Sequence, residues 1–273
     1  FFAKMVADKK YGFFTYAALL DACGLYDELD KSEDEVYYQK RMKGELEDLP
    51  QHPTFKGSGG PSPKTPGILP ERKYFGYTLF IENDEWWEKT LGLTDSTIHN
   101  MNPEELVAMV AAKVVENKWA LSSASTGTDY TDPNNALNQF VTYHIIPAKI
   151  EPNKLVIHFN ELWYNLTDKV KKASVYDFYT TMGKRRLLKT YEASRTFDGK
   201  RNIIYLNRFP KLNNATDGDY TEIACDDDKL GVEIITEGNP ETYNGYIYRL
   251  SDVLYYNDNT VETMGKERIR IDV

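Results

Sequence analysis

The chain has 273 residues and a formal net charge of −9, and at about 150 residues per domain it could hold one large domain or two small ones. With 41% hydrophobic and 27% charged residues and a mean hydropathy of −0.57, it resembles globular proteins rather than disordered chains or membrane-embedded bundles. The excess of 42 acidic over 33 basic side chains argues against a general nucleic-acid binder, because phosphate backbones repel an acidic surface.

The N-terminal part predicts one helix followed by a long surface segment. Apolar residues recur at helical spacing over 13–25, and Gly24 follows where a left-handed cap would end the helix. Residues 57–70 are rich in glycine and proline and can sustain neither helix nor strand. We therefore expect 28–73 to be an insertion that crosses the surface.

The next stretch predicts strands and helices in alternation. Residues 77–81 are β-rich, and Asn83 then offers a cap for a helix that ends at Gly92. Asn102, followed by proline and two glutamates, is typical of a helix start. The remaining expected elements are a helix over 134–143, stopped before Pro147, and a strand over 155–159.

The second half of the chain predicts mainly strands, separated by glycine-, asparagine- and aspartate-rich turns. These strands are expected over 186–192, 202–207, 231–236 and 246–256. Helices mainly in the first half of the chain and strands mainly in the second half favour an α+β fold. Charge is also segregated, because 166–211 holds twelve basic and four acidic side chains, whereas 212–241 holds one basic and nine acidic ones.

Motifs for catalysis, metals and cofactors are missing from the sequence. It has no nucleophile elbow, no zinc-protease motif, no dinucleotide fingerprint and no phosphate loop. Its four histidines lack helical ligand spacing, and its aspartate-rich turns lack the loop of a calcium site. We expect no cofactor and no metal, and we expect Cys23 and Cys225 to be two packed thiols rather than a disulfide.

One segment resembles a signature of a known family. Residues 138–150 contain Tyr143-His144 followed by branched aliphatics, and this pattern is similar to the second conserved box of fasciclin-like domains. Residues 13–25 resemble the opening helix, 77–86 the first box, and 231–234 with 244–254 the closing hairpin. The first box has Glu82-Asn83 where the family usually has a proline nearby, and Tyr248 stands where the family often has a histidine.

The resemblance implies a fasciclin-like wedge, a twisted β-sandwich with helices packed along one edge. It would cover 1–258, with insertions near 28–73, 116–133 and 160–200, while 259–273 would be a connector to a further domain. The chain starts at Phe1-Phe2 without a methionine, so we expect a fragment of a multi-domain parent. Large bacterial surface members of the family suggest a lipid-anchored protein at the outer cell surface or outside the cell, with any membrane contact through an anchor elsewhere in the parent.

The resemblance also implies adhesion rather than catalysis. The expected partners are a surface glycan, an extracellular protein such as a matrix protein, or neighbouring domains of the parent chain, and no nucleic acid. The alternative is a glycan-processing hydrolase with two carboxylates about 5 to 9.5 Å apart across a cleft. A basic face formed by 166–211 would suit an acidic polysaccharide as a variant of the first hypothesis.

Four residues are candidate binding residues: Tyr143, His144, Trp119 and Trp163. Exposed aromatic rings stack on sugars and fill protein pockets at low entropic cost, which also makes Tyr37-Tyr38 candidates. For each ring, however, core packing is the favoured interpretation. For His144 a structural role is favoured, in which the ring donates to a backbone carbonyl and accepts from another donor, tying its helix to the sheet.

Overall fold

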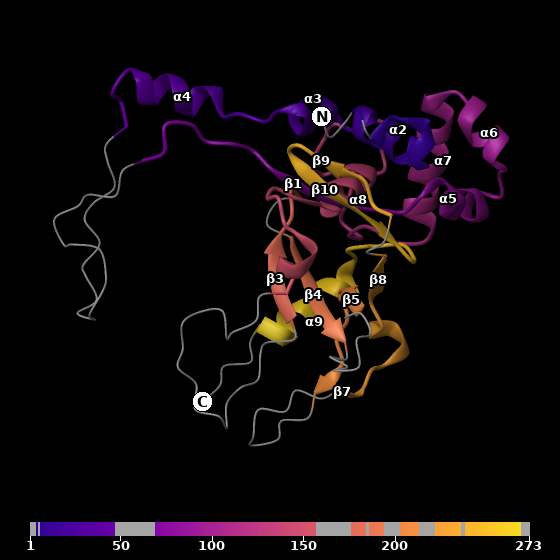
Figure 1. Ribbon diagram of the computed structural model, residues 1–273. Coiled ribbons are helices and arrows are strands. Elements are labelled where there is room, and N and C mark those ends of the chain that lie inside the picture. Colours follow the sequence, from indigo (N-terminus) through magenta and orange to yellow (C-terminus); the bar gives the residue numbers. More distant parts are fainter. Residues whose placement is uncertain are drawn as a thin grey trace. The chain divides into compact units, whose positions relative to one another are not determined.

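A computed structural model of the chain describes residues 4, 6–46, 69–156, 176–183, 186–193, 203–212, 222–235 and 238–268. The chain divides into a main unit, Phe1–Asp30 with Gly76–Val273, and an inserted unit, Lys31–Phe75. The described residues combine several α-helices with a mixed sheet (Figure 1). The predicted α+β class is therefore confirmed.

The main unit is built on a sheet with strand order β2-β1-β10-β8-β5-β4-β3. β1 and β10 run parallel, with Tyr77 opposite Gly245 and Ile81 opposite Arg249, and the other pairs of this sheet are antiparallel. All five residues of β1 are buried, as in strands that are covered on both faces. The strands are β1 (Tyr77–Ile81), β2 (Ile145–Ile146), β3 (Tyr176–Thr180), β4 (Leu187–Ala193), β5 (Ile203–Leu206), β8 (Val232–Ile235), β9 (Glu241–Thr242) and β10 (Gly245–Leu250), while β6 (Lys211–Leu212) and β7 (Glu222–Ala224) form a separate pair.

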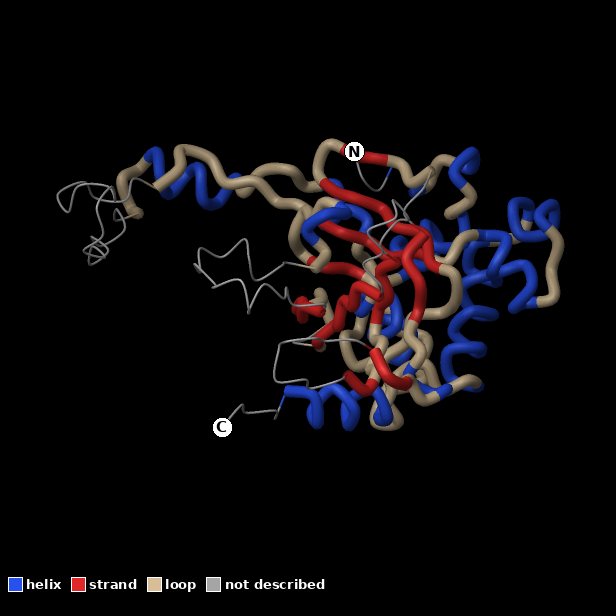
Figure 2. The backbone as a smooth tube through the Cα atoms, turned by 60° about the horizontal axis from the view of Figure 1, so that its bottom comes forward, coloured by secondary structure: helices blue, strands red, loops and turns tan. Residues whose placement is uncertain are grey.

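A group of helices lies along one side of the strands (Figure 2). Within the main unit, α2 packs against α5 and α7, and α7 packs against α8. The helices of the main unit are α2 (Phe14–Ala22), α3 (Tyr26–Asp30), α5 (Asp84–Leu91), α6 (Asp95–Asn100), α7 (Pro103–Glu116), α8 (Ala136–Tyr143) and α9 (Asp258–Arg268), with 3₁₀ turns η1 (Lys9–Tyr11), η2 (Pro152–Lys154) and η4 (Asp227–Lys229).

Capping residues set the helix boundaries that the sequence predicted. The Asn83 side chain accepts the Trp86 amide at 3.0 Å and begins α5. Gly92 ends that helix with φ of +68°, in the left-handed region that glycine adopts without strain. Asn102 accepts the Glu104 amide at 2.9 Å, and proline occupies the first position of α7. These signals are local, which is why they could be recognised in the sequence.

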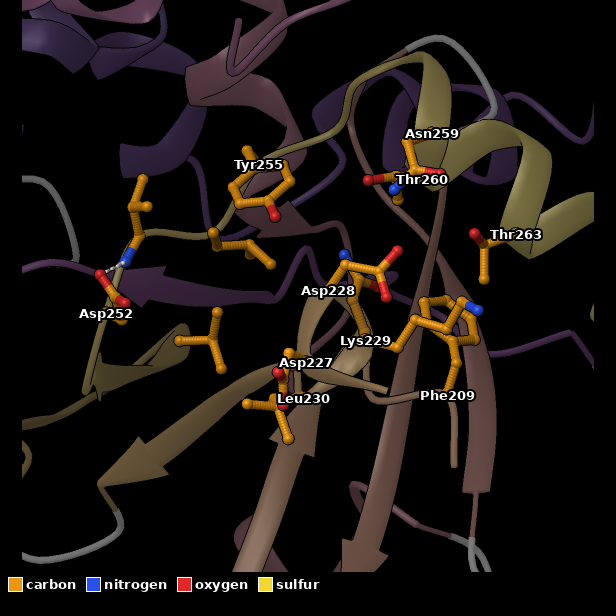
Figure 3. Close-up of a pocket in the computed structure, with 15 residues that line it drawn as sticks. Phe209, Asp227, Asp228, Lys229, Leu230, Asp252, Tyr255, Asn259, Thr260 and Thr263 are labelled. Atoms are coloured by element: carbon orange, nitrogen blue, oxygen red, sulfur yellow. Dashed lines mark hydrogen bonds between the residues drawn. The ribbon is translucent and has the colours of Figure 1, made fainter. Parts of the chain in front are cut away.

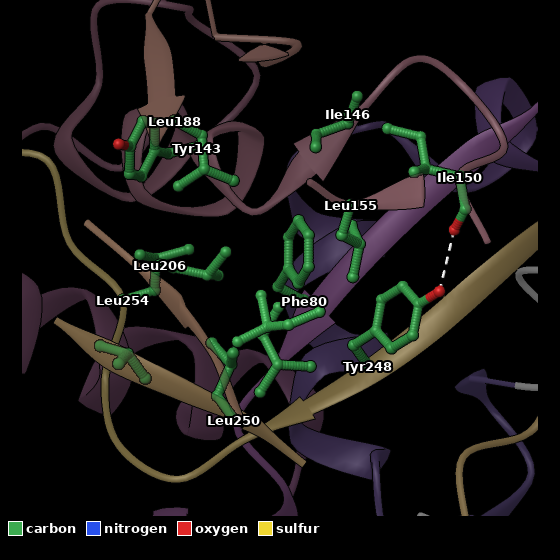
Figure 4. Close-up of a cluster of buried hydrophobic side chains, with 13 residues drawn as sticks. Phe80, Tyr143, Ile146, Ile150, Leu155, Leu188, Leu206, Tyr248, Leu250 and Leu254 are labelled. Atoms are coloured by element: carbon green, nitrogen blue, oxygen red, sulfur yellow. Dashed lines mark hydrogen bonds between the residues drawn. The ribbon is translucent and has the colours of Figure 1, made fainter. Parts of the chain in front are cut away.

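The hydrophobic core lies against the sheet and includes residues from strands, loops and α8 (Figure 4). Phe80 of β1 and Tyr248 of β10 stack with ring centroids 5.7 Å apart. The Tyr248 hydroxyl donates to the Ile150 carbonyl at 2.8 Å, so this core tyrosine satisfies its polar end without reaching water. The core thereby fixes the loop after β2 to β10 and, through the stacked rings, to β1.

Two predicted strands differ from the structure. Leu155 and Val156 follow η2 and belong to no strand, while 157–159 lie outside the described residues. The strand predicted over 246–256 ends at Leu250, because Asp252 turns its carboxylate onto the Val253 amide at 2.7 Å and the chain bends. Residues 259–268, predicted to be part of a connector, belong to α9 (Asp258–Arg268), in which Met264 is buried.

The inserted unit contains α4 (Glu35–Met42), whose first turn is capped by Asp34. The Asp34 amide donates to the Lys73 carbonyl at 2.8 Å, and the Phe75 amide donates to the Ser32 carbonyl at 3.0 Å. None of its described residues, 31–46 and 69–75, is buried. The insertions near 28–73, 116–133 and 160–200 stay predictions, and 47–68, 157–175, 184–185 and 194–202 lie outside the described residues.

Candidate functional site

The end of α8 places Tyr143 and His144 in the interior of the main unit, each with 0% of its surface exposed. The Tyr143 hydroxyl donates to the Leu187 carbonyl at 2.8 Å and accepts from Asn207 Nδ2 at 3.0 Å. Burial raises the pKa of Tyr143, so the hydroxyl keeps its proton at neutral pH. Tyr143 therefore joins α8 to β4 and to the residue after β5.

His144 joins α8 to two other segments. Its Nδ1 lies 2.7 Å from the Phe140 carbonyl and its Nε2 lies 3.0 Å from Glu82 Oε1. A carbonyl only accepts, so Nδ1 carries a hydrogen. The Leu254 amide also donates to Glu82 Oε1 at 2.9 Å. The pair thus ties α8 to the residue after β1 and to residues 252–256, called here the 252–256 segment.

Trp119 is buried rather than an exposed anchor, with 8% of its surface accessible. Its ring stacks on Phe140 with centroids 5.7 Å apart and also contacts Trp86 and Trp87. Its carbonyl accepts the Tyr256 amide at 3.2 Å. Three of the four candidate residues, Tyr143, His144 and Trp119, therefore form one buried cluster, called here the buried frame, which is tied to the 252–256 segment. The protein covers their rings, so these rings cannot stack on a ligand.

Trp163, the fourth candidate residue, lies outside the described residues. Tyr37 and Tyr38 are half-buried on α4 of the inserted unit. Of the four predicted binding residues, the structure brings Tyr143, His144 and Trp119 together.

A cavity of about 250 Å³ lies beside this frame (Figure 3). It is lined by residues 227–232, by 252–255, by Asn207 and Phe209, and by Asn259, Thr260 and Thr263 of α9. Asn207, which bonds Tyr143, and Leu254, which bonds Glu82, are both part of the lining. The buried frame therefore holds two parts of the cavity wall in place.

Four polar side chains of the lining keep their hydrogen-bonding capacity for a ligand. They are Asp228, Tyr255, Asn259 and Thr263, and within the described part of the chain none of these side chains makes a hydrogen bond or a salt bridge. They come from η4, from the 252–256 segment and from α9. Side chains of this kind around a hollow with apolar walls are typical of a small-molecule site.

The cavity is electronegative. Its lining holds the carboxylates of Asp227, Asp228 and Asp252 and one ammonium group, that of Lys229. Lys229 pairs with Asp226 at 3.0 Å, and this contact raises the pKa of Lys229 and lowers that of Asp226. The ammonium is thus engaged by a residue outside the lining, so the carboxylates dominate the potential inside.

Two further hollows flank α7, with volumes of about 460 and 440 Å³. They share Val115, Thr126 and Ala136, and α7 lines them mainly with alanine and valine. These hollows are larger, and the second also has polar side chains without a hydrogen-bond partner among the described residues, those of Lys118, Ser122, Thr126 and Asn259. We take the cavity beside η4 as the candidate site because Asn207 and Leu254 join its wall to Tyr143 and Glu82, which puts it next to the predicted binding residues.

The sequence did not identify this cavity as a site. The aspartate-rich turn at 226–228 lacks the loop of a calcium site, and 259–263 belong to the predicted connector. The walls of the cavity come from four segments spread over residues 207–263, and only the fold brings Asn207, η4, the 252–256 segment and α9 around one space. A signal visible only in the structure is the positive φ of Asn207, +52°, a conformation that is uncommon outside glycine.

The basic residues of 166–211 do not all face outward. Arg186 and Lys189 are buried, and the Lys189 ammonium lies 4.8 Å from the Tyr176 ring centroid and 4.7 Å from that of Phe209. These two charges are therefore not part of a basic surface for an acidic polysaccharide.

Neither cysteine is in a disulfide, as predicted: Cys23 is buried and Cys225 is half-buried. Burial raises the pKa of the Cys23 thiol to about 12, so it is not a nucleophile at neutral pH. In the described part of the chain, no group of three or more histidine, cysteine or acidic side chains is placed to hold a metal ion. No described helix is both long enough and apolar enough to span a bilayer.

Comparisons with models of known protein families, with curated proteins and with solved structures find no match for this chain.

Proposed function

We propose that this chain is a non-catalytic extracellular adhesion or surface-assembly module with a fasciclin-like wedge fold. Four sequence blocks in family order motivate the proposal, and the α+β fold is compatible with it. The proposed setting is the outer surface of a bacterial cell, in a parent protein anchored by lipid. The partner is a surface glycan, an extracellular protein or a neighbouring subunit.

The observation that carries the proposal is the cavity beside η4. It combines a wall that Tyr143 braces through Asn207 and Glu82 braces through Leu254 with polar side chains that make no hydrogen bond within the described residues. A preformed hollow of this kind binds a ligand without first having to order its own residues. Such a site suits selective adhesion.

The alternative, a glycan-processing hydrolase, remains a second proposal because Asp227, Asp228 and Asp252 all line the cavity. Hydrolysis needs two of them on opposite sides of a bound sugar. Asp252 already accepts the Trp86 indole N–H at 3.2 Å and the Val253 amide at 2.7 Å. Since this carboxylate is engaged within the chain, the geometry favours binding over hydrolysis.

Binding of the whole chain to a panel of glycans, matrix proteins and its own second copy, at physiological salt, tests the proposal. We expect saturable binding to one of these and intact ligand afterwards. Thr263→Trp should abolish binding because a bulky ring fills the cavity, whereas Glu262→Trp, on the exposed side of α9, should not. Cleaved glycan would support the hydrolase instead, and binding to none of the three classes would refute the adhesion proposal.

A further inference from the structure

We propose that the cavity beside η4 binds an uncharged sugar ring that presents neighbouring hydroxyl groups to Asp228. This inference rests on the proposed adhesive function and names the ligand class of its site. It is argued from the size of the cavity, from the chemistry of its walls and from its charge.

The size suits one ring. Pockets for drug-sized ligands span about 300 to 1,000 Å³, and this cavity encloses about 250 Å³. A single sugar unit at the end of a glycan is therefore a better fit than an extended peptide.

The walls have the two kinds of surface that a sugar ring requires. Phe209, Val232 and Val253 are nearly buried in the main unit and give the lining its apolar part, while Tyr255 adds a half-exposed ring. A sugar ring has C–H faces that pack on such a surface, and hydroxyl groups at its rim that require partners.

The polar partners come from two other elements that line the cavity. Asp228 comes from η4, and Asn259 and Thr263 come from α9 (Figure 3). A carboxylate offers two acceptor oxygens, so it can accept from two adjacent hydroxyl groups at once. Hydrogen bonds to an ionised acceptor are shorter and roughly twice as strong as neutral ones. Asp228 is therefore the main polar contact, and Asn259 and Thr263 can donate or accept at the rest of the rim.

The charge of the lining selects against acidic sugars. Three carboxylates line the cavity, and its single ammonium group is paired with Asp226. A uronic acid or a sulfated sugar would place another negative charge among them. This conclusion is opposite to the acidic polysaccharide considered from the basic 166–211 segment.

Titration of the whole chain with methyl glycosides tests the inference, with binding followed by ligand-observed NMR and calorimetry. The uncharged probes are the methyl glycosides of glucose, galactose, mannose and N-acetylglucosamine, and the matched acidic probes are methyl glucuronide and methyl galacturonide. We expect an uncharged glycoside to bind at least about tenfold more tightly than its uronate. A difference of tenfold corresponds to about 1.4 kcal/mol.

Variants assign the contact to Asp228. Asp228→Asn should weaken binding of the uncharged sugar about tenfold or more, since a hydrogen bond to a charged group is stronger than one to a neutral group. It should also reduce the difference in affinity between the uncharged sugar and its uronate, because one negative charge that repels the uronate is removed. Glu262→Gln, a carboxylate on the exposed side of α9 that is paired with Lys266, is the matched control and should leave both affinities unchanged. Thermal melting of each variant verifies that it is folded.

The outcomes separate this inference from the adhesive function. Equal sugar affinity in Asp228→Asn, or tighter binding of the uronates, overturns the inference while adhesion stands. Binding of an extracellular protein or a second copy, but of no sugar, has the same meaning. Binding of none of these partners overturns both.

Discussion

Glu82 and His144 form a hydrogen-bonded pair in which both side chains are closed to solvent. Nδ1 of His144 donates to the Phe140 carbonyl, and its Nε2 lies 3.0 Å from Glu82 Oε1. Glu82 Oε2 has no hydrogen-bond partner within the described residues. A buried ionisable pair adds little net stability over a well-packed apolar pair. Removing one partner, however, leaves the other buried without its hydrogen bond, and this is strongly destabilising. We infer that the pair fixes how α8 and the 252–256 segment meet.

His144→Ala should lower the free energy of unfolding by about 3 to 5 kcal/mol, because it leaves the Glu82 carboxyl buried with only the Leu254 amide as a partner. Urea denaturation followed by circular dichroism at neutral pH measures the loss. The control is a double-mutant cycle with Glu82→Gln, which should recover part of the loss since the stranded group is then neutral. A loss below about 1 kcal/mol, or no recovery in the double variant, would show that the pair is not coupled in this way.

The residue-scale prediction for His144 was partly correct. Its bond to a backbone carbonyl, which ties the end of α8, is present as expected. The second partner is the Glu82 carboxyl, which the sequence did not identify. Glu82 and His144 are 62 positions apart in the chain, and local periodicity carries no information on such a contact.

At the scale of elements, the sequence located those helices and strands that have a capping residue or a clear apolar pattern. Residues 77–81 and the helix after Asn102 were located well, because β-rich composition and capping chemistry are local. α4 was missed because none of its residues is buried and it therefore has no apolar face. The parallel pairing of β1 with β10 could not be predicted either, since strands so far apart in the chain meet only through tertiary packing.

The start of β8 depends on a glycine with no room for a side chain. Gly231 has φ of +72°, and a Cβ there would lie 2.5 Å from the Leu206 carbonyl oxygen and 2.7 Å from the Arg208 amide nitrogen. Gly92, at the end of α5, has nearly the same φ of +68° but no atom within 4 Å of an added Cβ. An alanine at Gly92 would therefore cause backbone strain alone, whereas an alanine at Gly231 would cause both backbone strain and a steric clash.

Gly92→Ala should cost about 1 kcal/mol, the usual penalty for a left-handed non-glycine residue. Gly231→Ala should cost at least about 2 kcal/mol more, because the clashing atoms belong to the backbone of the adjoining strand and cannot move aside cheaply. Chemical denaturation of both variants gives the comparison. Equal losses would mean that the strand end shifts freely, and the cavity wall beside Gly231 would then be less rigid than the site requires.

At the scale of the whole molecule, stability is concentrated in the main unit. All buried hydrophobic side chains of the described residues lie between Val6 and Leu29 or between Tyr77 and Met264. The inserted unit contributes none of them, and the two ends of its chain are already joined by the hydrogen bond from the Phe75 amide to Ser32 at 3.0 Å. The main unit therefore has the buried surface expected of a part that folds by itself.

Replacing residues 33–74 by a four-residue glycine and serine turn should leave the main unit folded, with a melting temperature within about 4 °C of the parent chain. The expectation follows because no described core side chain is removed, and because shortening a loop stabilises by about 0.6 kcal/mol for each halving of its length. Calorimetry measures the transition, and Leu29→Ala in the parent chain is the control. Leu29 is completely buried next to the replaced segment, so its truncation should cost about 2 to 5 kcal/mol and prove that the assay detects core damage. A shortened chain that melts far below the parent, or that does not fold, would show that Lys31–Phe75 supports the main unit through more than its described residues.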